Sequence, residues 1–208
     1  MLNLRKKTGK ERTVWITYMA ILIAMIVVLT CLPIKTLGLE ITIALIPIAI
    51  GSVLLDPISG LILGGVYGVC SFLQCFGLLL PSPFGAALVG INPVMTAVTC
   101  IVPRLICGFV PGIVYLAIKK VDKTNVIAQV VGCLVCPILN TLFFMSFLMI
   151  FFGGTDLIKG FMDTLGIFNP ILFVFAFVGI NGLVEILACA IIAPALVKAL
   201  EQVNKRLI

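Results

Sequence analysis

Arg104 is a charged residue in the middle of an apolar stretch. It lies about a dozen residues from either end of the segment 92–118, which is long enough to cross a lipid bilayer. A guanidinium stays charged there, and its placement near the bilayer midplane costs roughly 2.5 to 3.5 kcal/mol on insertion scales. Such a residue usually has a charged partner, a polar cavity or a ligand.

Polar residues in the two following apolar segments are expected at the depth of Arg104. Counted from the outer ends of their helices, Arg104, Asn140 and Asn181 each lie roughly 11 or 12 residues in, about 16 to 18 Å at 1.5 Å per residue. Glu185 follows Asn181 by one turn on the same helical face. Together with two flanking polar residues, they form the candidate substrate-binding set, which is Arg104, Asn140, Thr141, Asn181, Glu185 and Asn92.

Two interpretations of this set stay open, and they are not exclusive. In the first, Arg104 and Glu185 form a buried structural ion pair while the asparagines bond across helices. In the second, Arg104 and the asparagines line a cavity that binds a small polar or anionic solute. Ion pairing alone does not explain why three consecutive helices place polar groups at one depth below two long external loops, which favours the binding site.

Other chemistries find little support in the sequence. The chain has eight cysteines and no histidine, so the CxxC formed by Cys133 and Cys136 lacks the partners of a metal or redox site. An intramembrane enzyme using Glu185, Asp56 or a cysteine is an alternative, but Asp56 is expected at a cytoplasmic turn and no nucleophile has a paired histidine. A channel would require polar residues along a whole helix face, whereas here they gather at one level.

Composition predicts an all-α integral membrane protein. Of 208 residues, 62% are hydrophobic and only 11% are charged, and the apolar residues fall in blocks. The length accommodates a bundle of six transmembrane helices as a single domain, residues 1–208, without a soluble domain. The expected spans are residues 13–33, 43–55, 58–80, 92–118, 126–152 and 170 to about 198.

The net charge of +6 predicts membrane orientation and not nucleic-acid binding. Basic residues cluster before the first span, at 119–123 and in the C-terminal tail, while the opposite side of a six-span chain holds only Lys35 and Lys159. The positive-inside rule therefore places both termini in the cytoplasm. The first apolar run is too long for a signal peptide and lacks a small-residue cleavage site, so we expect a retained helix.

Three further patterns predict helix contacts and loops. Gly60, Gly64 and Gly68 recur at four-residue steps and favour a backbone-close contact with another helix of this chain. The uncharged connection 81–92 is rich in Pro, Gly and Ser, which predicts a well-formed turn or a loop capping a cavity. In the segment 153–169, Leu157, Phe161 and Leu165 recur at four-residue spacing, which is typical of a short helix on the surface or over a site.

The chain resembles a known family of transport subunits. Ala20 and Ala24 form an AxxxA in the first span, and the segments SVLLDPISGLILGGVYG, NPVMTAVTCIVPRLICGFVPG and NGLVEILACAIIAPAL follow. With the six-span layout, these features are similar to the substrate-binding S component of energy-coupling factor (ECF) vitamin transporters. Within that family the likeness is greatest to the pantothenate-specific type.

The resemblance implies a function, partners and roles for residues. It implies a bacterial cell-membrane subunit without enzymatic activity or cofactor, whose first helix docks through Ala20 and Ala24 on a membrane-embedded T subunit driven by two cytosolic ATPases. No phosphate-binding GxxxxGK[ST] loop is present in the chain, which agrees with that division of labour. The vitamin would bind among the last three spans after capture from outside, and the subunit would then topple to release it.

For pantothenate, Arg104 could hold the carboxylate while Asn140, Thr141 and Asn181 contact the remainder. Riboflavin, folate or a pyridoxine-type compound are the alternative vitamins.

Overall fold

The computed structural model describes residues 9–32, 35–36, 39–40, 43–122, 124–167 and 169–207. Two short antiparallel strands, β1 (Lys35–Thr36) and β2 (Leu39–Glu40), join the first two helices. All other elements in this part of the chain are helices, namely α1 (Gly9–Thr30), α2 (Leu45–Leu54), α3 (Pro57–Cys75), α4 (Pro83–Ile91), α5 (Pro93–Lys119), α6 (Val126–Phe152), α7 (Asp156–Leu165) and α8 (Pro170–Leu207). The all-α prediction is confirmed.

Five helical segments of the described chain are long and apolar enough to cross a membrane. They are α1, α3, α5, α6 and the part Gly182–Val203 of α8. The second expected span is shorter, because α2 has ten residues and a length of about 15 Å. All ten are buried among α1, α3, α5, α6 and α8, so the backbone of α2 is enclosed by protein. The chain is a multi-pass membrane protein, and the sixth span stays a prediction.

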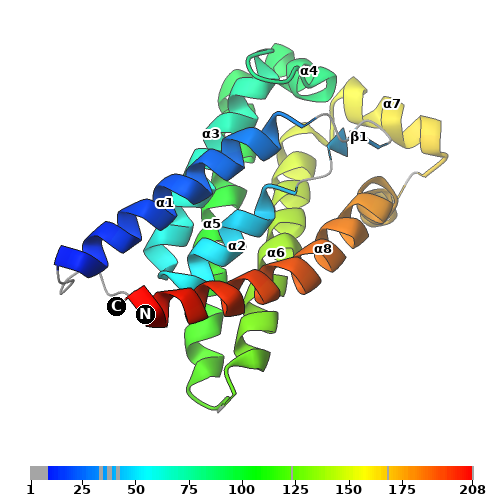
Figure 1. The fold of residues 1–208 in the computed structure, drawn as a ribbon. Coiled ribbons are helices and arrows are strands. Elements are labelled where there is room, and N and C mark those ends of the chain that lie inside the picture. The colour runs from blue at the N-terminus through cyan, green and yellow to red at the C-terminus, as the bar shows by residue number, and fades with distance from the viewer. Residues whose placement is uncertain are drawn as a thin grey trace.

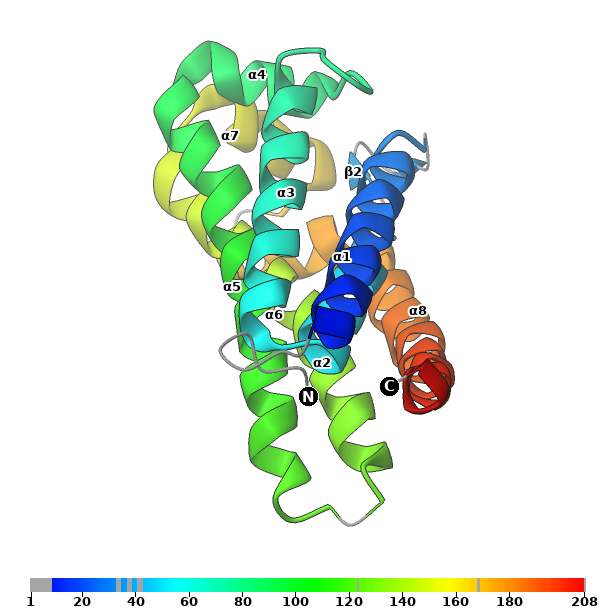
Figure 2. The same cartoon turned by 60° about the vertical axis from the view of Figure 1, so that its left-hand side comes forward.

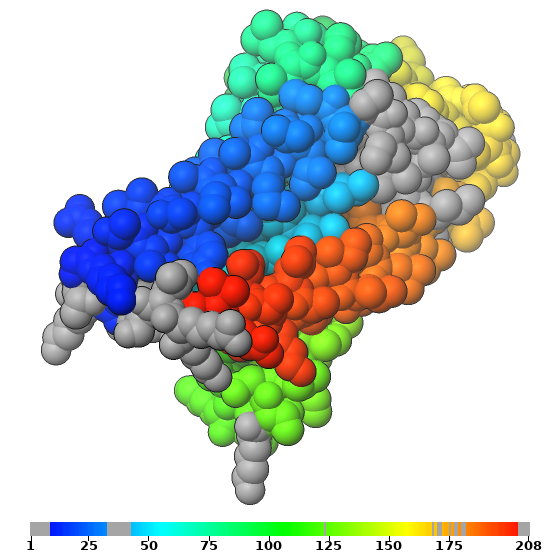
Figure 3. Space-filling view, viewed as in Figure 1, coloured from blue at the N-terminus to red at the C-terminus, as the bar shows by residue number. Residues whose placement is uncertain are grey.

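The two ends of the bundle carry different elements. In Figures 1 and 2, α4 and α7 lie together at one end, and the turn between α5 and α6 projects at the other. We call these the lid end and the turn end, and we call α4 and α7 together the lid. In Figure 3, α1 and α8 run across one face with a strip of α2 between them. The first turn of α1 and the last turn of α8 lie toward the turn end (Figure 1).

Helices α3 and α5 pack backbone against backbone, as the glycine pattern predicts. A Cβ atom on Gly64 would collide with the carbonyl oxygen of Arg104, and one on Gly60 would collide with the carbonyl oxygen of Gly108. At Gly68 the nearest atom to such a Cβ would be the Cα of Ile101, at 3.0 Å. Glycine lets the two helix axes come this close, and the contact sets the height and rotation of α5 in the bundle.

Cross-helix hydrogen bonds tie α1 to α3. The indole Nε1 of Trp15 donates to Ser59 Oγ at 2.9 Å, and Gln74 Nε2 donates to the carbonyl oxygen of Thr30 at 2.9 Å. These bonds lie near opposite ends of α1. They satisfy polar groups that would otherwise be buried without partners, and they fix α1 along its length.

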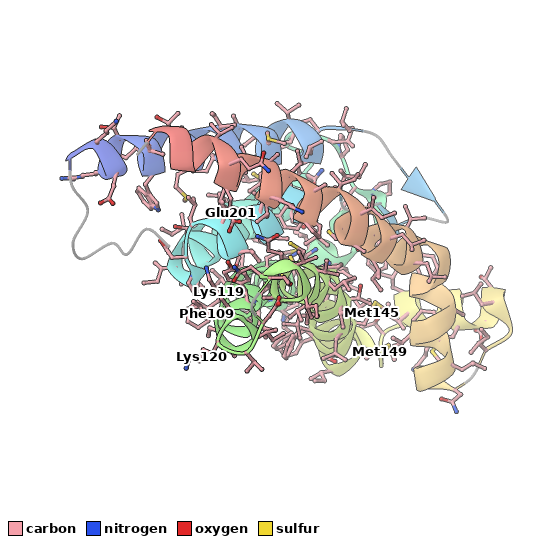
Figure 4. The ribbon with its side chains drawn as sticks, turned by 60° about the horizontal axis from the view of Figure 1, so that its bottom comes forward. Phe109, Lys119, Lys120, Met145, Met149 and Glu201 are labelled. Carbon is pink, nitrogen blue, oxygen red and sulfur yellow. The ribbon has the colours of Figure 1, made fainter. Side chains whose placement is uncertain are left out.

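A third cross-helix bond lies toward the turn end. Gln129 Nε2 of α6 donates to Glu201 Oε2 of α8 at 2.9 Å. Figure 4, which turns the bottom of the molecule forward, shows Glu201 on α8, Lys119 at the end of α5 and Lys120 directly after it. These three residues place charged side chains at the turn end.

The two connections at the lid end differ in how well the sequence predicted them. The expected short helix in 153–169 is α7, whose most buried residue is Ile158, while Leu165 is 44% exposed. The inward face is therefore rotated from the expected Leu157–Phe161–Leu165 stripe toward Ile158. The connection 81–92 contains a helix, α4, where we expected a turn or loop. Ser82 caps α4 by accepting a hydrogen bond from Gly85 N at 3.3 Å.

Helix α8 is bent. Its backbone leaves helical geometry at Gly179, where φ is 12° and ψ is −104°. Glycine tolerates such angles because it has no Cβ. The sequence prediction of a continuous last span did not include this kink, which lies two residues before Asn181.

Candidate functional site

Arg104 lies inside the bundle, on the part of α5 that packs against α3. Only 6% of its surface is exposed. Pro103, just before it, has no N–H to donate to the carbonyl oxygen of Thr99, its helical partner four residues back. Arg104 Nη1 donates to that carbonyl oxygen at 3.0 Å. The proline thus frees an acceptor within the helix, and the arginine next to it uses the acceptor.

Two aromatic rings flank the Arg104 guanidinium. The Cζ atom lies 4.7 Å from the ring centroid of Phe144 on α6 and 5.4 Å from that of Tyr67 on α3. A cation near the face of an aromatic ring is stabilised by about 0.5 to 2 kcal/mol, with the upper values at desolvated sites. These rings and the Thr99 carbonyl group partly compensate the cost of the buried charge.

Asn140 lies on α6 between two residues that contact α5. One turn before it, Cys136 contacts Cys107 of α5, and one turn after it, Phe144 covers Arg104. Asn140 is 6% exposed, so its side chain lies inside the protein at the α5–α6 contact. Residues four apart share a helix face, which puts Asn140 on the face of α6 turned toward Arg104.

Arg104 and Asn140 each keep one buried atom without a hydrogen-bond partner among the described residues. These atoms are Arg104 Nε, a donor, and Asn140 Oδ1, an acceptor. A buried polar atom without a partner costs about 1 to 3 kcal/mol, and such atoms call for an explanation in a folded protein. A ligand with an anionic group beside a hydroxyl or amide donor would satisfy both.

Two further atoms without partners lie elsewhere. Within the described part of the chain these are Ser52 Oγ and Asp56 Oδ2. Asp56 caps α3, since its Oδ1 accepts a hydrogen bond from Ser59 N at 2.7 Å. Ser52 and Asp56 lie at the end of α2 and the start of α3, away from the lid, so they do not belong to the Arg104 group.

The lid covers the Arg104 side of the bundle with apolar side chains. Phe84 of α4 and Phe161 of α7 meet edge to face, with ring centroids 5.7 Å apart. Both rings pack against a buried cluster that also includes Phe144, the residue over Arg104, and its fully buried members are Leu88, Met145, Leu148, Phe152, Ile158 and Phe173. The lid is thus continuous with the aromatic cover of the guanidinium.

The other expected binding residues are placed as follows. Glu185 is 7% exposed on α8, and the contacts described for Arg104 do not include it, so their pairing stays a prediction. The side chain of Asn181 lies outside the described residues. Thr141 is partly buried beside Asn140. Asn92 Oδ1 accepts hydrogen bonds from Val94 N and Met95 N at 3.1 Å and thereby caps α5. A substrate contact from this side chain would therefore be made by its carboxamide nitrogen.

Ala20 and Ala24 lie on the outward face of α1. Both are exposed, and Thr13 and Thr17 continue the same stripe of small residues toward the start of the helix. The hydroxyl of Thr17 donates to the carbonyl oxygen of Thr13 at 3.0 Å, so this side chain is bonded within its own helix. The side chains of this stripe therefore project only a short distance from α1 on the outside of the bundle.

Sequence reasoning missed three contributors to the Arg104 environment: Thr99, Tyr67 and Phe144. A signal for Thr99 was present, because Pro103 identifies the carbonyl group that it frees. Tyr67 and Phe144 come from other helices, and their approach depends on the α3–α5 and α5–α6 packing. No spacing within one helix could have identified them.

A family model described as "ECF transporter, substrate-specific component" matches residues 15–197. The matched range includes Arg104 and Asn140 as well as the small-residue stripe of α1 from Thr17 onward. A search of curated proteins found no match.

Proposed function

Because the chain belongs to the family of ECF transporter substrate-specific components, we propose that it is the pantothenate-binding subunit of an uptake transporter. Members of this family are multi-pass membrane proteins and transport subunits, not enzymes. They bind small-molecule substrates and work with a membrane T subunit and ATPase subunits. Pantothenate as the substrate, the binding residues and the docking face are the specific content of the proposal.

The observation that carries the proposal is that buried Arg104 on α5 and buried Asn140 on the adjoining helix α6 each keep an unpartnered polar atom, Nε and Oδ1. Arginine presents several N–H donors in a planar fork that matches a carboxylate. In a dry pocket such a contact is strong, because water does not compete for it. Pantothenate offers one carboxylate together with hydroxyl groups and an amide, which suit the side chains of Asn140, Thr141 and Asn181. Glu185 is the resting partner of Arg104 in this proposal.

Charge separates pantothenate from the alternative vitamins. Riboflavin and pyridoxine-type compounds have no carboxylate, so the ligand itself would offer Arg104 no anionic group. Folate has a carboxylate-bearing end but is a much larger molecule than pantothenate. These vitamins remain alternatives that the binding experiment distinguishes.

The test removes the ligand carboxylate and the arginine separately. Calorimetry on the purified chain should give pantothenate binding at least about 100-fold tighter than binding of the corresponding alcohol, in which CH₂OH replaces the carboxylate. Arg104→Ala should lower pantothenate affinity to the level of the alcohol and leave the affinity for the alcohol unchanged.

Gln129→Ala is the matched control for this test. It removes a buried polar side chain at the turn end and should leave binding intact. Equal affinity of the wild-type chain for the acid and the alcohol would contradict the assigned role of Arg104. Tight binding of another vitamin instead would contradict the choice of pantothenate while leaving the family assignment in place.

The outward stripe of α1 is the proposed docking face for the T subunit. Trp15 and Gln74 hold α1 against α3, so the stripe around Ala20 and Ala24 faces away from the bundle as part of a fixed surface. Small side chains let another helix approach closely. The proposal also places the termini in the cytoplasm and the lid outside, in accord with the charge distribution, and treats residues 1–208 as one substrate-binding unit.

Ala24→Leu should abolish co-purification of the T and ATPase subunits and leave vitamin binding unchanged. The physical reason is that the larger side chain separates the two helix surfaces. Ala117→Leu makes the same replacement on an exposed position of α5 and should retain the complex. Retention of the complex by Ala24→Leu would show that the docking face lies elsewhere.

A further inference from the structure

Two thiols meet between α3 and α5 close to Arg104. Cys75, the last residue of α3, and Cys100 of α5 place their sulfur atoms 3.8 Å apart. Cys75 donates its S–H proton to the carbonyl oxygen of Ser71 at 3.3 Å, and in the contact between the two thiols either sulfur can act as the donor. Both cysteines are at least nine-tenths buried. A disulfide requires a sulfur separation of about 2.05 Å, which is a short movement from this contact.

The pair connects the binding residues to the lid. Cys100 lies one helical turn from Arg104 on α5. Cys75 lies directly against α4, because a Cβ atom on Gly85 would come within 2.6 Å of its sulfur. The backbone N–H of Ser82, just before α4, also donates to the carbonyl oxygen of Gln74 at 3.3 Å. A covalent link at Cys75 would therefore hold the base of α4 to the helix that carries Arg104.

We propose that Cys75 and Cys100 are a redox-responsive pair whose disulfide restrains the lid over Arg104. The regulatory part rests on the proposed function, which places the lid on the outer side of the membrane, where disulfides persist. The oxidant is a small uncharged disulfide. A thiolate of the pair attacks it and releases one small thiol, and the second cysteine then displaces the other. Two protein thiols and one oxidant molecule give one protein disulfide and two small thiols.

Oxidation with 2,2′-dithiodipyridine tests whether the link forms. This uncharged disulfide can enter an apolar protein interior, and mass spectrometry of unreduced peptides should then identify a Cys75–Cys100 cross-link that a reductant removes. Cys100→Ser should abolish the cross-link, and Cys75→Ala is a second variant that should do the same. Cys107→Ser, a buried thiol on the same helix, is the matched control and should retain it.

Hydrogen exchange of the α4 backbone tests restraint of the lid and needs no substrate. In the cross-linked chain, exchange at residues 83–91 should be at least about fivefold slower than in the reduced chain, because opening of α4 is suppressed. Cys100→Ser treated in the same way should show no slowing. Absence of the cross-link, a cross-link between other cysteines, or unchanged exchange in the cross-linked chain would each overturn the proposal.

Dissociation of bound vitamin gives a second readout that separates this proposal from the proposed function. If the reduced chain binds pantothenate, its release should be at least about tenfold slower after cross-linking, in parallel with exchange at α4. If the reduced chain binds no vitamin, the proposed function fails, and the exchange result still decides the role of the cysteine pair. Release at an unchanged rate from the cross-linked chain would contradict restraint of the lid.

Discussion

The α3–α5 interface and the aromatic cluster that joins α6 to the lid both reach Arg104, and they are built from opposite kinds of residue. Glycines bring the backbones of α3 and α5 together, and the main chain of Arg104 is part of that contact through Gly64. The lid and α6 meet through aromatic rings, and one of these, Phe144, lies over the Arg104 side chain. Backbone contacts allow no adjustment without moving a helix, whereas aromatic side chains can change rotamer. The comparison indicates a rigid frame for the main chain of Arg104 and a movable cover for its side chain.

The largest expected effect comes from Gly64→Ala. The added methyl group would meet the carbonyl oxygen of Arg104, so the two helices must separate, at a cost of about 3 kcal/mol or more. Thermal unfolding in detergent should show a strongly destabilised chain.

Gly65→Ala is the control, since its nearest contact would be the end of the Leu105 side chain at 3.3 Å. This substitution should be neutral or slightly stabilising, because alanine favours a helix over glycine by up to about 1 kcal/mol. Equal stability of the two variants would show that the α3–α5 contact is not the rigid frame.

A smaller effect is expected from Phe161→Ala in the lid. Loss of the edge-to-face pair with Phe84 should weaken closure by about 0.5 to 1.5 kcal/mol beyond the lost burial, which corresponds to roughly two- to tenfold faster vitamin release. Stopped-flow release measurements would detect this change, while the melting temperature should fall only slightly.

Phe147→Ala is the matched control for the lid. Phe147 stacks on Phe151 of its own helix, with ring centroids 5.7 Å apart, and this pair does not join α4 to α7. Phe147→Ala should leave the rate of vitamin release unchanged. An equal acceleration by both substitutions would indicate general loosening of α6 and not a movable lid.

The smallest effect is expected at Asp122, in the turn between α5 and α6, which belongs to neither region. Hydrogen bonds from Ala128 N, the Thr124 hydroxyl and Thr124 N lower the pKa of this carboxyl group. Its stabilising contribution is therefore present above the unfolded pKa of about 3.9 and is lost as pH falls through the lower folded pKa.

Protonation of Asp122 below about pH 4 should lower the melting temperature of the wild-type chain, and Asp122→Asn should abolish this decrease without changing vitamin binding. Melting curves at several pH values between 3 and 6 would measure the difference between the two chains, which should narrow toward low pH. A change in vitamin affinity in Asp122→Asn would show that the turn is coupled to the lid end, contrary to the comparison.

Features that depend on local chemistry were predictable from the sequence. The bounds of α6 agree with the expected span 126–152, and the glycine stripe of α3 makes the close contact that its spacing indicates. Helix α7 was also expected, although its buried face is centred on Ile158. The helix α4 was missed even though Ser82 and Pro83 form a typical helix start, because the composition of 81–92 favoured a turn.

Features that depend on packing between helices were not predictable. The α2 segment was read as a span from its apolar composition, but burial on all sides makes a short helix equally apolar. The kink at Gly179 could not be located, since glycine permits such angles without requiring them. The depth count placed Arg104 and Asn140 at one level, and the structure brings α5 and α6 together there.

By itself the sequence determined that this protein lies in a membrane, that its charge resides in a buried arginine and in polar ends, and that its glycines require a close helix pair. These properties follow from hydropathy, charge and side-chain size, which act locally. Only the tertiary structure decided what surrounds Arg104: the Thr99 carbonyl group and the rings of Tyr67 and Phe144. These contacts join three helices, so they depend on relative rotations that no single segment encodes.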